Sequence, residues 1–193
     1  MNTWTANRRN ALLSLGSLAC LPLASWAAAA TLPDDSVYQL RAELVDQDGR
    51  AFELSSLRGG PVLASMFYTS CEMVCPMIFE TIQRTVKALP AADQRAMKML
   101  MVSIDPARDS VAVLKKTANA HACDARWTLA RCDDATVRKL AAVLGIQYRR
   151  LPSGEFNHSS TIELLDREGR VAARSGKLGS VDPALVMAIR QSV

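Results

Sequence analysis

The sequence has little net charge, no internal repeat and no low-complexity segment. Its 193 residues include 23 Lys and Arg against 19 Asp and Glu. Arg8 and Arg9 fall in the first thirty residues, which contain no acid, so the rest has 23 − 2 = 21 basic residues against 19 acidic ones. So small a surplus argues against nucleic acid as a partner. Nothing after residue 35 resembles an interdomain linker, so residues 31–193 are expected to form one domain with its own core.

Residues 1–30 have the order of a secretory signal. Arg8 and Arg9 precede a long uncharged stretch, rich in Leu and Ala, that ends in small residues. This order is typical of export signals, and the arginine pair resembles a twin-arginine signal, with ordinary export as the alternative. We expect cleavage near Ala28 or Ala30 and a periplasmic protein. The alternative is an uncleaved N-terminal membrane anchor, because about 20 apolar residues can span a bilayer.

Cysteines are too few to serve as the scaffold of the fold. Four follow the predicted signal, namely Cys71, Cys75, Cys123 and Cys132. A domain of this size does not need the disulfide network that small secreted folds require. At least one cysteine pair is therefore expected to serve chemistry rather than structure.

Apolar runs and turn residues predict an α/β fold. An N-terminal hairpin is expected from Tyr38–Val45 and Ala51–Leu54, and strands buried on both faces from Val62–Tyr68 and Lys98–Ile104. Further strands are expected at Trp127–Ala130, Gln147–Arg149, Thr161–Asp166 and Val171–Arg174, and helices at Val111–Ala120, at Asp133–Leu144 and after Pro76 and Asp182. This alternation indicates a mixed central β-sheet flanked by helices. Cysteines at the first buried strand-to-helix junction make a thioredoxin-like fold the expected arrangement.

Cys71 and Cys75 lie where the first buried strand gives way to a helix that Pro76 is expected to begin. Unpaired N–H groups at a helix N-terminus favour a thiolate, which is both a nucleophile and a metal ligand. Thiol-exchange enzymes of the thioredoxin type use Cys-x-x-Cys, whereas three residues separate this pair. The wider spacing leaves room for a metal ion and still allows a disulfide. A purely structural disulfide is the plain alternative.

His158 stands just before the expected strand Thr161–Asp166. A lone histidine at the entrance to a strand is by default a solvated loop residue. An imidazole brought beside two thiolates would instead complete a three-ligand site suited to copper. The residues alone leave both interpretations open.

Three segments in order, Thr69–Pro76, Ser103–Asp109 and Asn157–Ser160, resemble motifs of the Sco (SenC) family of copper-handling proteins. The resemblance covers roughly residues 37 to 190, which is nearly the whole predicted domain. The ordered trio is far more specific than any one motif alone. One departure is Glu72, which stands where family members commonly have Pro after the first cysteine.

The resemblance implies that Cys71, Cys75 and His158 bind copper. Thiolate and imidazole donors suit both common oxidation states of copper, although zinc accepts the same trio with a water. The family's role implies delivery of copper to the copper-site subunit of cytochrome c oxidase or to another cuproenzyme. The alternative is a thiol-disulfide reductase that acts on the cysteines of such a partner. Cys71 and Cys75 would then form a redox-active disulfide that a separate thiol-disulfide reductant reopens. A binding protein is favoured over an enzyme.

Other polar and sulfur-containing residues have weaker signals. Asp105 ends a buried strand, where it would either orient a ligand or cap the turn that contains Pro106. Met73 is a candidate transient thioether ligand, although methionines near apolar runs usually fill cores.

Cys123 and Cys132 flank the short strand around Trp127 and are not part of the family pattern. In an oxidising compartment a disulfide between them is the leading expectation. Free thiols are one alternative, and a second metal site that includes His121 is another, because His-x-Cys is a weak metal signal.

Overall fold

A computed structural model describes residue 1 and residues 31–193. The predicted signal at residues 1–30 therefore lies, apart from Met1, outside the described residues. Residues 31–193 form one compact unit. Within this described part of the chain, no helix is both long and apolar enough to cross a bilayer.

A seven-stranded mixed sheet lies at the centre of this unit, in the order β2-β1-β5-β4-β3-β8-β9. Its strands are β1 (Glu43–Asp46), β2 (Ala51–Glu53), β3 (Val62–Phe67), β4 (Lys98–Ser103), β5 (Trp127–Arg131), β8 (Ile162–Leu165) and β9 (Val171–Ser175). β4 pairs in parallel with β3 and β5, and the other neighbouring strands pair antiparallel. The predicted mixed sheet and N-terminal hairpin are thus confirmed.

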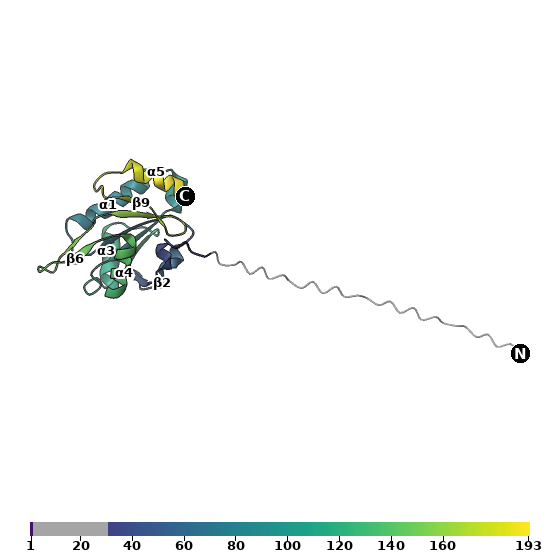
Figure 1. The fold of residues 1–193 in the computed structure, drawn as a ribbon, viewed down its shortest axis with the longest axis horizontal. Coiled ribbons are helices and arrows are strands. Elements are labelled where there is room, and N and C mark those ends of the chain that lie inside the picture. The colour runs from purple at the N-terminus through teal and green to yellow at the C-terminus, as the bar shows by residue number, and fades with distance from the viewer. Residues whose placement is uncertain (2–30) are drawn as a thin grey trace. The chain divides into compact units, whose positions relative to one another are not determined.

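Helices cover both faces of the sheet. They are α1 (Val74–Lys87), α2 (Ala91–Ala96), α3 (Val111–Ala120), α4 (Asp134–Leu144) and α5 (Pro183–Ser192), with two 3₁₀ helices, η1 (Val37–Gln39) and η2 (Leu54–Leu57). α1 and α5 lie on one side of the sheet and α3 and α4 on the other (Figure 1). The short α2 was not predicted, because its Ala-Ala-Asp-Gln-Arg-Ala sequence buries no side chain and gives no apolar periodicity.

The central strands are largely apolar because the sheet is covered on both faces. Every residue of β3 is buried, and β4 runs beside it in register from Val62↔Lys98 onward. Phe79 of α1 packs edge-on against Phe67, with 5.5 Å between ring centroids, and is stacked on Trp127 at 5.6 Å. This packing fixes α1 on the sheet, so its N-terminus lies beyond the carboxyl end of β3.

Two predicted boundaries were wrong. The strand expected over Tyr38–Val45 begins with a 3₁₀ turn instead, because the Ser36 hydroxyl accepts a hydrogen bond from the Tyr38 N–H and caps that turn. α1 begins at Val74, so Pro76 is its third residue rather than its first. Proline is tolerated there because the first-turn N–H groups of a helix have no intrahelical partner.

β6 (Tyr148–Arg150) and β7 (Phe156–His158) form a second, two-stranded antiparallel sheet. Tyr148 pairs with His158 and Arg150 with Phe156. The strand β7 was not expected, and His158 lies at its end rather than in a loop. The following text calls residues 148–158 the β6–β7 hairpin.

Candidate metal centre

The segment that leads from β3 to the first cysteine is held by a buried carboxylate. Asp109, which is 1% exposed, accepts hydrogen bonds from the Thr69 N–H at 3.2 Å and the Thr69 hydroxyl at 2.5 Å. The Ser103 hydroxyl, at the end of β4, donates to the same carboxylate at 2.6 Å. The chain then turns, with the Cys71 N–H donating to the carbonyl of Tyr68 at 3.2 Å. Cys71 is thereby placed directly over the start of α1.

Cys71 and Cys75 occupy different environments. Cys75 is 3% exposed in the first turn of α1, whereas Cys71 is half-buried in the loop. The Cys75 N–H points at the Cys71 sulfur, with N···Sγ 3.5 Å. Burial raises the pKa of Cys71, but hydrogen bonds from backbone N–H groups of the turn, that of Cys75 foremost, outweigh it and lower the pKa below its ordinary value. Burial raises the pKa of Cys75 strongly. The pair thus combines a half-buried cysteine whose pKa is lowered with a buried cysteine whose pKa is raised.

His158 faces Cys75 from β7. Its Nε2 lies 3.8 Å from the Cys75 sulfur, and its Nδ1 lies 3.1 Å from the carbonyl oxygen of Ser159. That carbonyl assigns the ring proton to Nδ1, which leaves the Nε2 lone pair directed at the sulfur. Burial lowers the pKa of His158, partly offset by the Ser159 hydrogen bond, so the neutral form is favoured. Neutral imidazole is the form that binds metals.

The separation of these two donors fits a shared metal ion. Metal–imidazole and metal–thiolate bonds of about 2.1 and 2.3 Å, at angles of about 109–120°, place the two donor atoms about 3.6–3.8 Å apart. The observed Nε2···Sγ distance is 3.8 Å. Among residues 31–193, however, no three His, Cys, Asp or Glu side chains are already gathered as a complete metal site. Cys75 and His158 therefore form a pair at ligand spacing, and Cys71 adjoins Cys75 without completing a three-residue cluster among the described residues.

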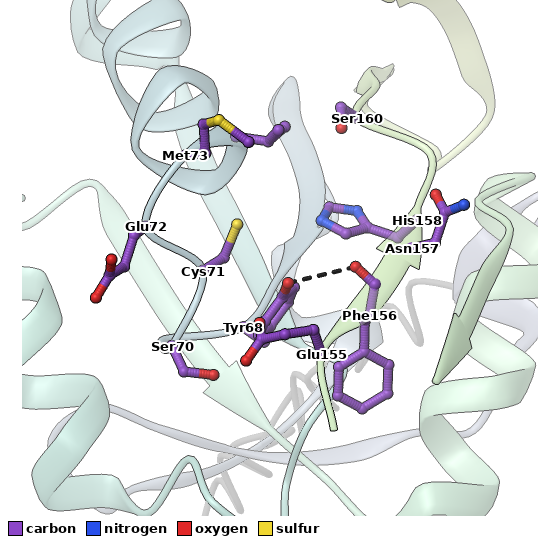
Figure 2. Close-up of a pocket in the computed structure, with 11 residues that line it drawn as sticks. Tyr68, Ser70, Cys71, Glu72, Met73, Glu155, Phe156, Asn157, His158 and Ser160 are labelled. Atoms are coloured by element: carbon purple, nitrogen blue, oxygen red, sulfur yellow. Dashed lines mark hydrogen bonds between the residues drawn. The ribbon is translucent and has the colours of Figure 1, made fainter. Parts of the chain in front are cut away.

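A cavity of about 610 Å³ opens between Cys71 and His158. Figure 2 shows that Cys71 and His158 border it from opposite sides, with Tyr68 beneath them. The carboxylate of Glu72 points away from His158 (Figure 2). Met73 lines the same cavity and is 75% exposed, so it is not a core residue. The cavity gives an incoming ion or protein access to the Cys71 side of the site.

Cys123 and Cys132 do not form the expected disulfide, because both are free. They lie beyond opposite ends of β5, whose five residues span about 16 Å, whereas a disulfide requires Cα atoms within about 7 Å. Burial raises the pKa of each to about 12. His121 stacks on Phe79 with ring centroids 4.1 Å apart, which is a packing role. The second metal site that sequence allowed here is thus absent from the described residues.

Three residues that help to build the site were not singled out from the sequence. Tyr68 lines the cavity between Cys71 and His158 and donates a hydrogen bond to the carbonyl of Phe156 at 3.3 Å. Asp109 anchors the cysteine loop, and Arg108 pairs with the buried Asp105. The available signal was the charged segment Asp105–Asp109 directly after an apolar strand, since polar groups gather at this edge of α/β sheets.

The fold and the site together define a thioredoxin-like protein with a cysteine pair and a facing histidine. Residues 33–192 match the SCO1/SenC family model, and the chain belongs to this family. It is 30% identical, over 107 residues, to a protein of Stutzerimonas stutzeri named for copper binding; the match covers 55% of this chain and 47% of that protein.

Solved structures of Sco proteins confirm the thioredoxin-like fold. ScoI of Bradyrhizobium japonicum, solved with copper bound, is 25% identical with a TM-score of 0.67, covering 78% of this chain and 96% of that one. BsSco is described as a member of the Sco family of cytochrome c oxidase assembly proteins with a disulfide switch. It is 22% identical with a TM-score of 0.67, covering 79% of this chain and 91% of that one.

Proposed function

We propose that this chain is an exported copper-binding protein that delivers copper to cytochrome c oxidase or another respiratory cuproenzyme. Cys71, Cys75 and His158 would be the ligands, and residues 31–193 the working domain in the periplasm, either released from residues 1–30 or tethered by them. The observation on which the proposal rests is the 3.8 Å separation of His158 Nε2 and Cys75 Sγ, with the Cys71 sulfur 3.5 Å from the Cys75 backbone nitrogen. Two soft sulfurs and one imidazole favour copper among the ions available outside the cytoplasm. The copper-bound ScoI and the Stutzerimonas relative support the choice of metal.

The environments of the two thiols suggest the order of copper uptake. Cys71 has the lowered pKa and borders the open cavity, so its thiolate would meet copper first. Cys75 is buried as a thiol, so binding there must release its proton. Release to a partner would follow the reverse order, with the partner's own cysteines replacing Cys71 first. Such ligand exchange transfers the ion without freeing it into solution.

The test is a copper titration of the reduced protein against a competing chelator. We expect one copper ion per chain and a loss of tight binding in His158→Ala. The matched control is His121→Gln, which alters the only other histidine and should bind copper like the wild type. Electron paramagnetic resonance of the copper(II) form should show nitrogen hyperfine coupling that His158→Ala alone removes. Equal affinity and spectra in the wild type and His158→Ala would refute the proposal.

A second candidate function is a thiol-disulfide reductase for a copper-site partner. The accessible Cys71 thiolate above the buried Cys75 is the arrangement of an attacking and a resolving cysteine. Cys71 would attack a partner disulfide and release one partner thiolate, and Cys75 would then attack the Cys71 sulfur and release the other. Two electrons pass to the partner, and a thiol reductant must reopen the Cys71–Cys75 disulfide. Under this function Cys71→Ser abolishes exchange, whereas His158→Ala leaves it nearly intact.

A further inference from the structure

The histidine of the candidate site lies outside the main sheet. His158 is the last residue of β7, which pairs only with β6 among the described strands. A two-stranded hairpin is marginally stable by itself, so its position depends on what holds it against the rest of the protein. The position of His158 relative to Cys75 therefore depends on the attachments of the β6–β7 hairpin as well as on residues 159–161, which join His158 to β8.

Two side chains from the main body donate hydrogen bonds to this hairpin. Arg108 Nη2 donates to the carbonyl oxygen of Gly154 at 2.6 Å, at the turn between β6 and β7. Tyr68 donates to the carbonyl of Phe156 at a longer 3.3 Å, and the two rings pack with centroids 5.2 Å apart (Figure 2). Gly154 has φ +88°, a conformation that favours glycine. The shorter of the two hydrogen bonds is thus the one that the charged Arg108 donates to the Gly154 turn.

Arg108 is itself fixed by a buried partner. Its Nε donates to a carboxylate oxygen of Asp105, which is 3% exposed and lies two residues after the end of β4. The Asp105 N–H donates to the Ser103 hydroxyl at 3.0 Å, which ties this end of the strand further. A guanidinium group can serve two acceptors in fixed directions, whereas a lysine ammonium on its flexible stem lacks this planar fork. Arg108, whose side chain is 41% exposed, therefore connects the segment after β4 to the hairpin turn.

The same short segment also holds the cysteine half of the site. Asp109, next to Arg108, accepts both hydrogen bonds from Thr69, which stands two residues before Cys71. The Asp109 N–H in turn donates to the carbonyl of Asp105 at 2.9 Å. Within residues 105–109, Asp109 thus contacts the cysteine loop, and its neighbour Arg108 contacts the β6–β7 hairpin that carries His158.

We propose that Arg108 is a positioning residue that, by bridging Asp105 and the Gly154 carbonyl, holds His158 within ligand distance of Cys75. Arg108 touches neither cysteine nor imidazole in this role; it acts through the hairpin. The expected effect of Arg108 on copper affinity rests on the proposed function, whereas its expected effect on the position of the β6–β7 hairpin does not.

Hydrogen–deuterium exchange of the metal-free protein tests the hairpin directly. In Arg108→Ala we expect amides of residues 148–158 to exchange roughly tenfold faster, because a charge-assisted hydrogen bond is lost. The matched control is Arg84→Ala, since Arg84 also links a carboxylate, Glu80, to a glycine carbonyl, Gly179, but away from the hairpin. Unchanged exchange in Arg108→Ala, or an equal rise in both variants, would overturn the inference.

A double-mutant cycle tests whether Arg108 acts through His158. Arg108→Ala should weaken copper binding about tenfold, in proportion to the roughly tenfold faster opening expected of the hairpin that carries His158. Arg108→Lys should recover only part of that loss. In the His158→Ala background, Arg108→Ala should add nothing, because the ligand it positions is gone.

The outcomes separate this inference from the proposed function. An equal loss in both backgrounds, or no loss with Arg108→Ala where His158→Ala does weaken binding, would contradict the positioning role. If the wild type and His158→Ala bind copper alike, the proposed function fails, and the exchange measurement still decides whether Arg108 holds the hairpin.

Discussion

The imidazole Nε2 of His158 lies 3.8 Å from the sulfur of Cys75, although 83 residues separate the two in sequence. One donor comes from the first turn of α1 and the other from a hairpin outside the main sheet. Cys75 is 3% exposed, whereas Cys71 and His158 are both half-buried and border the same cavity. This asymmetry determines what can be expected of each cysteine.

Cys71 should react with iodoacetamide at lower pH than the other cysteines of residues 31–193. Its pKa lies below the ordinary 9.0 because backbone N–H groups outweigh the effect of burial. Burial raises the pKa of Cys123 and Cys132 to about 12, and only thiolates react. Mass spectrometry of the reduced, metal-free protein, alkylated over a range of pH, should show Cys71 modified first.

The same pKa shift has a defined sign for folding. Because the folded-state pKa of Cys71 is lowered, its contribution to the free energy of unfolding is present above pH 9.0 and is lost as pH falls through the folded-state pKa.

In the alkylation experiment, modification of Cys75 or Cys123 before Cys71 would contradict the assignment of Cys71 as the accessible, more acidic thiol.

Oxidation of the metal-free protein should link Cys71 to Cys75 and leave the other pair free. The first two cysteines adjoin each other at the start of α1, whereas β5 separates Cys123 from Cys132. Peptide mapping without reductant measures the linkage. A peptide that joins Cys123 to Cys132 would show that the free thiols of the structure are not the stable state.

Asp109→Ala should lower the free energy of unfolding by about 3 kcal/mol, because it leaves the Thr69 N–H and two hydroxyls without their buried acceptor. Urea denaturation followed by circular dichroism measures the change. Asp35→Ala is the control: Asp35 forms an exposed ion pair with Arg170, and such pairs contribute about 0–1 kcal/mol. Similar losses in both variants would refute the anchoring role of Asp109.

Glu72→Gln should leave copper affinity within about twofold of the wild type, because the carboxylate points away from His158 and is not expected to be a ligand (Figure 2). Glu72→Pro, which introduces the residue common in the family, should behave alike if it folds. Competition titration measures both. A tenfold loss in Glu72→Gln would instead make this carboxylate a copper ligand.

The sequence predicted the central strands well because their apolar runs are continuous. β3, β4 and α3 match the expected ranges to within a residue. It failed where local signals are weak: β7 has three residues, Phe-Asn-His, and no apolar alternation. The 3₁₀ turn at Val37–Gln39 depends on the cap formed by the Ser36 hydroxyl, and the strand-like residue pattern of this segment gives no sign of that turn.

The candidate site was only partly predictable. Backbone geometry at a helix N-terminus explains why Cys71 and Cys75 were recognised, whereas only family resemblance singled out His158. No local pattern states that residues 148–158 fold back as a hairpin toward α1. The roles of Asp109 and Arg108 likewise depend on contacts with Thr69 and Gly154, which are distant in sequence.

X-ray absorption spectroscopy of the reduced, copper(I)-loaded protein tests the central claim most directly. The account predicts two sulfur neighbours at about 2.3 Å and one imidazole nitrogen at about 2.0–2.1 Å, values typical of thiolate and histidine ligands. His158→Ala should remove the imidazole signal and leave both sulfurs. A copper shell of nitrogen and oxygen alone, or a spectrum that does not change in His158→Ala, would contradict a site built from Cys71, Cys75 and His158.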